Sequence, residues 1–163
     1  MKSPDKFLIG IVVAIVILVI VALAITLSRP EPTYQAEDTP EGIAHNYLMA
    51  LHREEYDRAY GYLSPDLAGY PTSAGEFAEH VQEYSWNFRL NTDATLSVES
   101  AITIASHGKV RVRESHFRGG NLFESSQSTR IFDVELEFED NEWKIVDAES
   151  YFARCWKQRW GCQ

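Results

Sequence analysis

The sequence has little cysteine: only Cys155 and Cys162 occur in 163 residues, and both lie among the last nine. No Cys-x-x-Cys motif is present, which excludes the usual dithiol redox site. No histidine lies near the pair in sequence, and no nucleotide-binding signature occurs, so we expect neither a metal nor another cofactor. Two cysteines this close favour a small terminal disulfide loop in an oxidising compartment, with thiols that stay reduced as the alternative.

Positive charge is scarce in most of the chain. After Pro30 there are 12 Lys/Arg against 23 Asp/Glu, and the net charge of the whole chain is −9. Because an acidic domain repels phosphate backbones, we expect no nucleic-acid partner. A hydrophobic content of 45% with 12% aromatic residues suits a folded core and does not suit a disordered chain.

One long apolar run stands out, "FLIGIVVAIVILVIVALAITL" at residues 7–27. About 20 apolar residues span a bilayer as a helix, so this run predicts a membrane contact. Lys2 and Lys6 precede it, whereas acidic residues soon follow Arg29, which favours a cytoplasmic N-terminus and an extracytoplasmic C-terminal domain. A cleaved signal peptide is the alternative, since "ALA" at 22–24 resembles a cleavage site, but the run is longer than a typical signal core.

These features predict a linear organisation. A cytoplasmic tail (1–6) precedes a single-pass signal-anchor helix in the cell membrane (7–28) and a polar linker (29–38), which contains two prolines. A folded domain follows at 39–153, and a C-terminal aromatic and cysteine tail occupies 154–163.

The domain changes its hydrophobic period near residue 90. Thr39 and Ser73 are typical helix caps, and apolar residues recur at helical spacing after each of them and again from Tyr56. Beyond Leu90 the apolar residues alternate with polar ones, as in half-buried strands. Three helices followed by about four antiparallel strands predict an α+β domain, with the helices packed on one face of a curved sheet.

Two stretches resemble a known superfamily. "GIAHNYLMALHREEYDRAYGYLSPDL" is similar to the opening helices, and "FEDNEWKIVDAESYF" to the closing hairpin, of nuclear transport factor 2-like domains, which include the SnoaL-like and ketosteroid-isomerase enzymes. The resemblance covers residues 39–153 and implies a cone-shaped α+β roll. Its enzymes use a Tyr on the opening helix, a base and a strand acid. Tyr47 matches the Tyr, but Val134 stands at the place of the acid and "LAGYPTSAG" offers no carboxylate base. The resemblance therefore favours a binding or scaffold domain, with an enzyme or small-ligand carrier as the alternative.

The closing hairpin suggests where a ligand would bind. A two-residue turn at Asp140-Asn141 would pair Val134 with Asp147, Phe132 with Glu149 and Arg130 with Tyr151, so that an apolar face ends in polar groups. Such a floor with convergent polar groups is typical of a ligand site. The candidates are Tyr47, Glu114, His116, Arg130, Asp147 and Glu149. The competing interpretations are a paired edge of the core, or a β-bulge that turns these side chains into water.

Three kinds of partner remain open. In the tail, "CWKQRWGC" combines Trp156 and Trp160 with basic residues, which predicts either packing over the domain or contact with an anionic membrane or a protein. The superfamily resemblance implies a homodimer through the open sheet face. The plan of short tail, single span and exported domain resembles the bitopic assembly subunits of type IV secretion systems, which implies a protein partner in a membrane complex.

Overall fold

The computed structural model describes residues 6–27, 32–89, 94–121 and 124–162. These form two compact units, Met1–Thr33 and Tyr34–Gln163. The predicted cytoplasmic tail lies outside the described residues except for Lys6, as do position 28 of the predicted span and positions 29–31 of the predicted linker.

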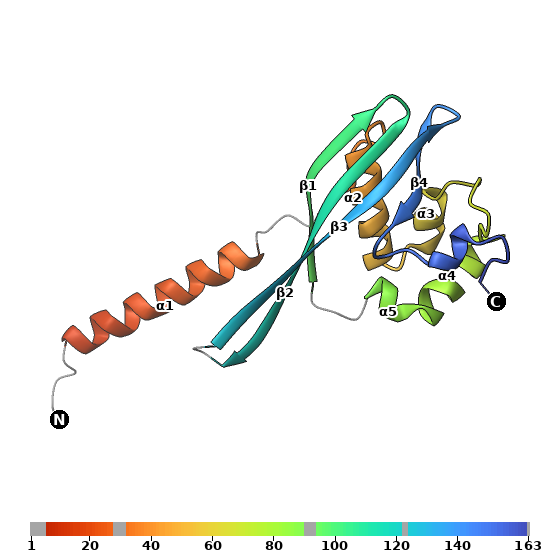
Figure 1. The fold of residues 1–163 in the computed structure, drawn as a ribbon. Helices are drawn as coiled ribbons and strands as arrows, with labels where there is room; N and C mark the ends of the chain where they lie inside the picture. Colours follow the sequence, from red (N-terminus) through yellow and green to blue (C-terminus); the bar gives the residue numbers. More distant parts are fainter. Residues whose placement is uncertain (1–5, 28–31, 90–93, 122–123, 163) are drawn as a thin grey trace. The chain divides into compact units, whose positions relative to one another are not determined.

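The first unit contains one helix, α1 (Lys6–Leu27), drawn in red to orange in Figure 1. The side chains at positions 8–25 are all exposed, and none of them belongs to a core. By length and composition α1 is able to cross a bilayer, and a signal sequence has the same character.

The second unit opens with four helices, which precede all of the strands: α2 (Pro40–His52), α3 (Tyr56–Gly61), α4 (Ala74–Glu83) and α5 (Ser85–Phe88). The predicted caps are confirmed, because the Thr39 hydroxyl accepts a hydrogen bond from Gly42 N and the Ser73 hydroxyl accepts one from Glu76 N. Three helices were predicted, and the structure adds the short α5.

A single antiparallel sheet follows, with the strands in the order of the chain: β1 (Ala94–Ile104), β2 (His107–Asn121), β3 (Glu124–Glu139) and β4 (Glu142–Ala148). Helix α2 contacts β1, β2 and β4, and Figure 1 shows it lying along the sheet. The predicted fold class, α+β with helices packed on an antiparallel sheet, is confirmed.

The core lies between α2 and the inner face of the sheet. Strand alternation supplies it, since Val110 and Val112 on β2 stand opposite Val134 and Phe132 on β3, and all four are fully buried or nearly so. Each such side chain contributes roughly 1.5–3 kcal/mol relative to an exposed position. The opposite face of the same strands carries Lys, Arg, Asp and Glu, which suits a sheet with one wet side.

The domain is longer at both ends than the sequence indicated. Gln35 N donates a hydrogen bond to Asn46 Oδ1 (2.7 Å), and Asn46 Nδ2 donates one back to Gln35 O (2.9 Å). Residues 34–38, expected in the linker, are therefore held against α2. In the C-terminal tail, Trp156 lies in a short 3-10 helix, η1 (Arg154–Lys157), and is a fully buried part of the core.

The closing hairpin follows the predicted register only near its turn. Asp140 and Asn141 have positive φ angles of 46° and 72°, as a two-residue hairpin turn requires, and Leu136 stands opposite Ile145 as predicted. Beyond Ile145 the predicted pairings are wrong. Val146 is an extra residue on β4, a β-bulge, so that Asp147 stands opposite Glu135 and Ala148 takes the inward position opposite Val134.

Candidate functional site

The most unusual group in the domain is Glu114, a carboxylate with 0% of its surface exposed. It follows Val110 and Val112 on the inner face of β2, so strand alternation directs it into the core. Its Oε1 lies 3.0 Å from Nε2 of His116, and its Oε2 lies 3.4 Å from a guanidinium nitrogen of Arg89. A buried carboxylate requires such partners, because an unpaired buried charge is very costly.

Tyr151 completes the cluster and links it to α2. Its hydroxyl donates a hydrogen bond to Glu114 Oε1 (3.0 Å), and its carbonyl accepts one from the Tyr47 hydroxyl (2.6 Å). Tyr151 N donates to Asn87 O (3.1 Å). Tyr151 and Arg89 both have positive φ, 61° and 46°, which is costly for residues with side chains and is held here by these contacts. The cluster thus joins α2, the segment after β4 and the residue that ends α5.

Both phenols of the cluster remain protonated. Burial, and next the nearby Glu114 carboxylate, raise the pKa of Tyr151 above its usual range. Burial alone raises the pKa of Tyr47 well above its usual range. Each hydroxyl is therefore a fixed hydrogen-bond donor over the physiological pH range, and neither is poised to act as a base.

The structure brings together only part of the predicted set. Tyr47, Glu114 and His116 belong to one network, and Arg130 is exposed on β3 as the cross-strand partner of Glu114. The bulge removes the other two predicted candidates from this face. Asp147 forms an ion pair with Lys157 instead, and the Glu149 side chain is exposed while its N–H donates to Asp133 O (3.2 Å).

Two members of the cluster were not among the candidates from the sequence. Tyr151 was expected to pair with Arg130 at the end of a strand, whereas the bulge and its left-handed backbone turn it toward Glu114. Arg89 follows the short α5, which the hydrophobic pattern did not predict. The sequence contains one signal for this cluster. Glu114 is in phase with the inward Val110 and Val112, and a carboxylate at a buried position needs a cation and a hydrogen-bond donor from other segments.

The geometry of the cluster favours a structural role over a catalytic one. Glu114 is fully buried, its oxygens accept from or lie close to three partners, and Val134, at the place of the superfamily's strand acid, is apolar. A general base must reach a substrate proton at hydrogen-bond distance. His116 and Arg89 are half-buried, so these two partners of the carboxylate are partly exposed to solvent.

Two surface hollows that described residues line contain none of the predicted site residues. The first, of about 590 Å³, lies between α3 and β4 and includes Arg58, Tyr62 and Trp143. The second, of about 410 Å³, lies on the outer face of the sheet and includes Ile102, Ile104 and Val146.

Ion pairs already occupy the first hollow. Arg58 binds Glu37 at 3.0 Å, and the Tyr62 hydroxyl donates to the same carboxylate at 2.6 Å. The hydrogen bond from Tyr62, followed by the interactions with Arg58, holds the pKa of Glu37 below its usual range. These contacts hold the segment before α2 against α3. This structural role explains the charged groups in the hollow, and no ligand is needed to explain them.

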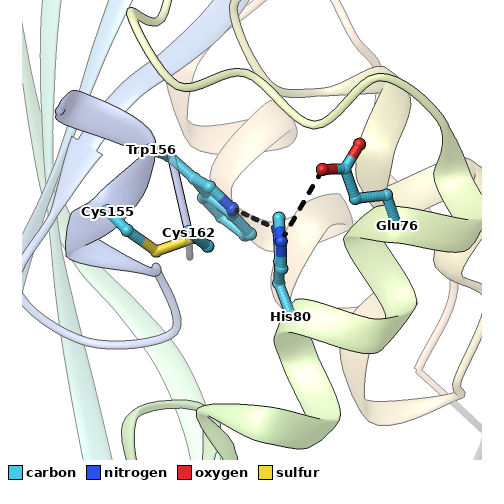
Figure 2. The surroundings of a disulfide bond; sticks show 5 residues. All are labelled: Glu76, His80, Cys155, Trp156 and Cys162. Carbon is cyan, nitrogen blue, oxygen red and sulfur yellow. Dashed lines mark hydrogen bonds and ion pairs between the residues drawn. A yellow bond between two sulfur atoms is a disulfide. The ribbon is translucent and has the colours of Figure 1, made fainter. Parts of the chain in front are cut away.

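The remaining predictions concern metals and cysteines. Within the parts of the chain that the structure describes, no group of three or more His, Cys, Asp or Glu side chains is arranged to hold a metal ion. Cys155 and Cys162 form a disulfide, drawn in Figure 2.

Comparisons with known proteins give structural similarity only. No protein-family model matches the sequence, and no curated protein matches it significantly. Several solved structures that the chain is similar to are nuclear transport factor 2-like proteins. One, of unknown function, comes from Shewanella oneidensis MR-1 (11% identity, TM-score 0.43, covering 65% of this chain and 90% of that one).

Two further examples extend this result. A protein described as an NTF2-like transpeptidase from Campylobacter jejuni is 17% identical, with a TM-score of 0.43, covering 67% of this chain and 98% of that one. An NTF2-like protein with a cystatin-like fold, from Novosphingobium aromaticivorans, is 8% identical, with a TM-score of 0.44, covering 66% and 75%. These three solved structures are all described as NTF2-like, which is the superfamily that the two sequence stretches resemble.

Proposed function

We propose that the chain is a membrane-tethered, extracytoplasmic domain that binds or scaffolds other proteins and is not an enzyme. The observation that carries this proposal is the enclosure of Glu114. Among the residues whose burial the structure describes, Glu114 is the one buried acid. Its carboxylate contacts Arg89, His116 and Tyr151, and with 0% of its surface exposed it offers no open face to a substrate. Binding then belongs to the outer surface.

The properties of α1 and of the cysteines support the tether and its orientation. Every described side chain from position 8 to position 25 is exposed, although all are apolar or small. Such a surface is unfavourable in water and favourable in lipid. The Cys155–Cys162 disulfide suits an oxidising compartment, as expected if the second unit is exported and Lys2 and Lys6 stay inside.

The outer face of the sheet is the surface that we assign to a protein partner. Ile102 and Ile104 on β1 are 62% and 72% exposed and border the 410 Å³ hollow. Around them β2 and β3 form ion pairs, such as Lys109 with Asp133 (3.1 Å). An exposed apolar patch with a charged rim is typical of protein interfaces. A second copy of the chain and a subunit of a membrane complex are the two partners that we propose for it.

The experiment uses the full chain in membranes, with a C-terminal tag. A photo-crosslinking amino acid replaces Ile104 in one variant and the exposed Glu79 of α4 in a control variant. We expect resistance to alkaline extraction, protease access from the extracytoplasmic side only, and a crosslink to a protein from position 104 alone. Extraction of the chain by alkali, or equal crosslinking from both positions, would contradict the proposal.

A small-ligand carrier or enzyme is the second candidate, because His116 and Arg89 reach the surface from the buried cluster. Glu114→Gln and His116→Gln test it. Loss of ligand binding or of a turnover with intact folding would favour this candidate, whereas loss of stability alone supports the scaffold.

A further inference from the structure

The C-terminal loop, defined here as residues 154–162, is anchored at one end by Trp156. This side chain is 0% exposed and packs between Phe77 (ring centroids 5.2 Å apart) and Phe152 (5.0 Å). Its indole Nε1 donates a hydrogen bond to His80 Nδ1 (3.1 Å), and Figure 2 shows His80 between Trp156 and Glu76. The loop therefore leaves the domain from a fixed point.

The disulfide and a close backbone approach fix the rest of the loop. Cys155 is bonded to Cys162, which closes the chain between them. Gly69 N donates to Trp156 O (2.8 Å), and a Cβ at Gly69 would lie only 2.6 Å from the carbonyl oxygens of Cys155 and Gln158. Only glycine permits this contact. The side chains that the loop carries are consequently presented by a constrained backbone.

Those side chains are cationic and aromatic, in contrast to the rest of the domain. Trp160 is 76% exposed, and Arg154 and Arg159 are exposed as well. No Asp or Glu occurs after Glu149, whereas the chain as a whole carries −9. Lys157 is partly neutralised by its ion pair with Asp147, so the two arginines are the main positive groups of the loop.

We propose that the C-terminal loop docks on an anionic phospholipid surface, with Trp160 at the interface and Arg154 and Arg159 on the lipid headgroups. Trp favours the boundary between headgroups and acyl chains, and cations near an anionic surface each strengthen binding. The acidic remainder of the domain is repelled by the same surface, so it favours contact through this loop alone.

A lipid surface fits better than a protein partner for a geometric reason. The loop presents one exposed Trp beside cations, and neither described hollow includes a residue of the loop that could receive a side chain of a partner. A deformable surface accepts such a tip without shape complementarity. The proposal does not depend on α1 spanning a membrane, because the loop alone makes the contact.

The test uses residues 33–163, which contain the second compact unit. Every described residue of its buried core lies between Ile43 and Trp156, so α1 supplies none of that core and we expect the unit to fold without α1. Sedimentation is measured with vesicles of equal parts phosphatidylglycerol and phosphatidylcholine, and with pure phosphatidylcholine. We expect binding to the anionic vesicles only, weakened by salt. Trp160→Ala should weaken it about tenfold, since a partly inserted Trp buries on the order of 60 Å² more apolar surface. Arg154→Gln combined with Arg159→Gln should weaken it roughly 25-fold, at about fivefold per cation.

The chain offers matched controls. Trp86 on α5 is 70% exposed, and Arg113 on the outer face of the sheet is exposed too, so Trp86→Ala and Arg113→Gln should leave vesicle binding unchanged. The proposal is overturned by absent or lipid-independent binding, or by equal losses in Trp86→Ala and Trp160→Ala. It is also overturned if Trp160→Ala binds vesicles normally but loses a crosslinked protein in cells, since the loop would then serve a protein partner. Failure of α1 to anchor the chain would leave this result unaffected.

Discussion

Tyr151→Phe should destabilise the domain by about 2 kcal/mol while leaving its fold intact. The change removes only a hydroxyl that is buried with its residue (3% exposed) and that donates at 3.0 Å to a carboxylate with no exposure. Hydrogen bonds to charged groups contribute roughly 1.5–3 kcal/mol, and Glu114 would keep His116 and the longer contact with Arg89. Urea unfolding of residues 33–163, followed by circular dichroism, measures the loss as a lower midpoint at constant slope.

Tyr34→Phe is the matched control, because it removes the same kind of bond at the surface. The Tyr34 hydroxyl donates to Glu55 at 2.6 Å, in an exposed position. Water replaces this partner, so the expected loss is under about 0.5 kcal/mol. If Tyr151→Phe lowered the free energy of unfolding no more than Tyr34→Phe does, Glu114 would not depend on the hydrogen bond from the Tyr151 hydroxyl. The argument that the buried acid is structural would then be refuted.

Three further predictions concern the two ends of the domain. Trp156→Ala should cost about 3–5 kcal/mol in urea unfolding, whereas Trp160→Ala should change stability by less than about 0.5 kcal/mol, because the first ring is buried and the second exposed. Replacing Cys155 and Cys162 together by Ser should lower the free energy of unfolding by about 2.5 kcal/mol, the value expected for a closed loop of this length. Equal stability of the wild type under oxidising and reducing conditions would contradict this. Glu37→Gln should lower the melting temperature at pH 7 but not near about pH 2. The lowered pKa of Glu37 contributes stability above about pH 4, and this is lost as the pH falls through the folded value.

The fold followed from periodicity because helix and strand patterns are local. The caps at Thr39 and Ser73 and the alternation of Val110 and Val112 each depend on neighbouring residues, and the structure confirms them. The turn at Asp140-Asn141 is equally local, and the register beside it is as predicted. What these signals have in common is that a few adjacent side chains determine them.

The site was less predictable because one residue changed the register. Val146 looks like an ordinary strand residue in sequence, yet as a bulge it moves Asp147 off the inner face and brings Ala148 onto it. A shift of one residue exchanges the two faces of a strand, so every assignment beyond it changes. The contact between Tyr151 and Glu114 joins residues 37 positions apart through a left-handed backbone, and no hydrophobic pattern contains that information.

The segment after β4 fills the interior of this domain, which favours a structural role for the interior over ligand binding. Tyr151 and Phe152 pack against the sheet and helices, and Trp156 stacks on Phe77 of α4, so the segment after β4 fills the space between these elements. A ligand that took the place of Tyr151 at Glu114 would break the hydrogen bonds that the Tyr151 backbone makes with Tyr47 and Asn87. The contacts of such a ligand would first have to offset the free energy of these lost hydrogen bonds. Recognition by this domain is therefore expected on its exterior, at the outer face of the sheet and at the loop that the same segment presents.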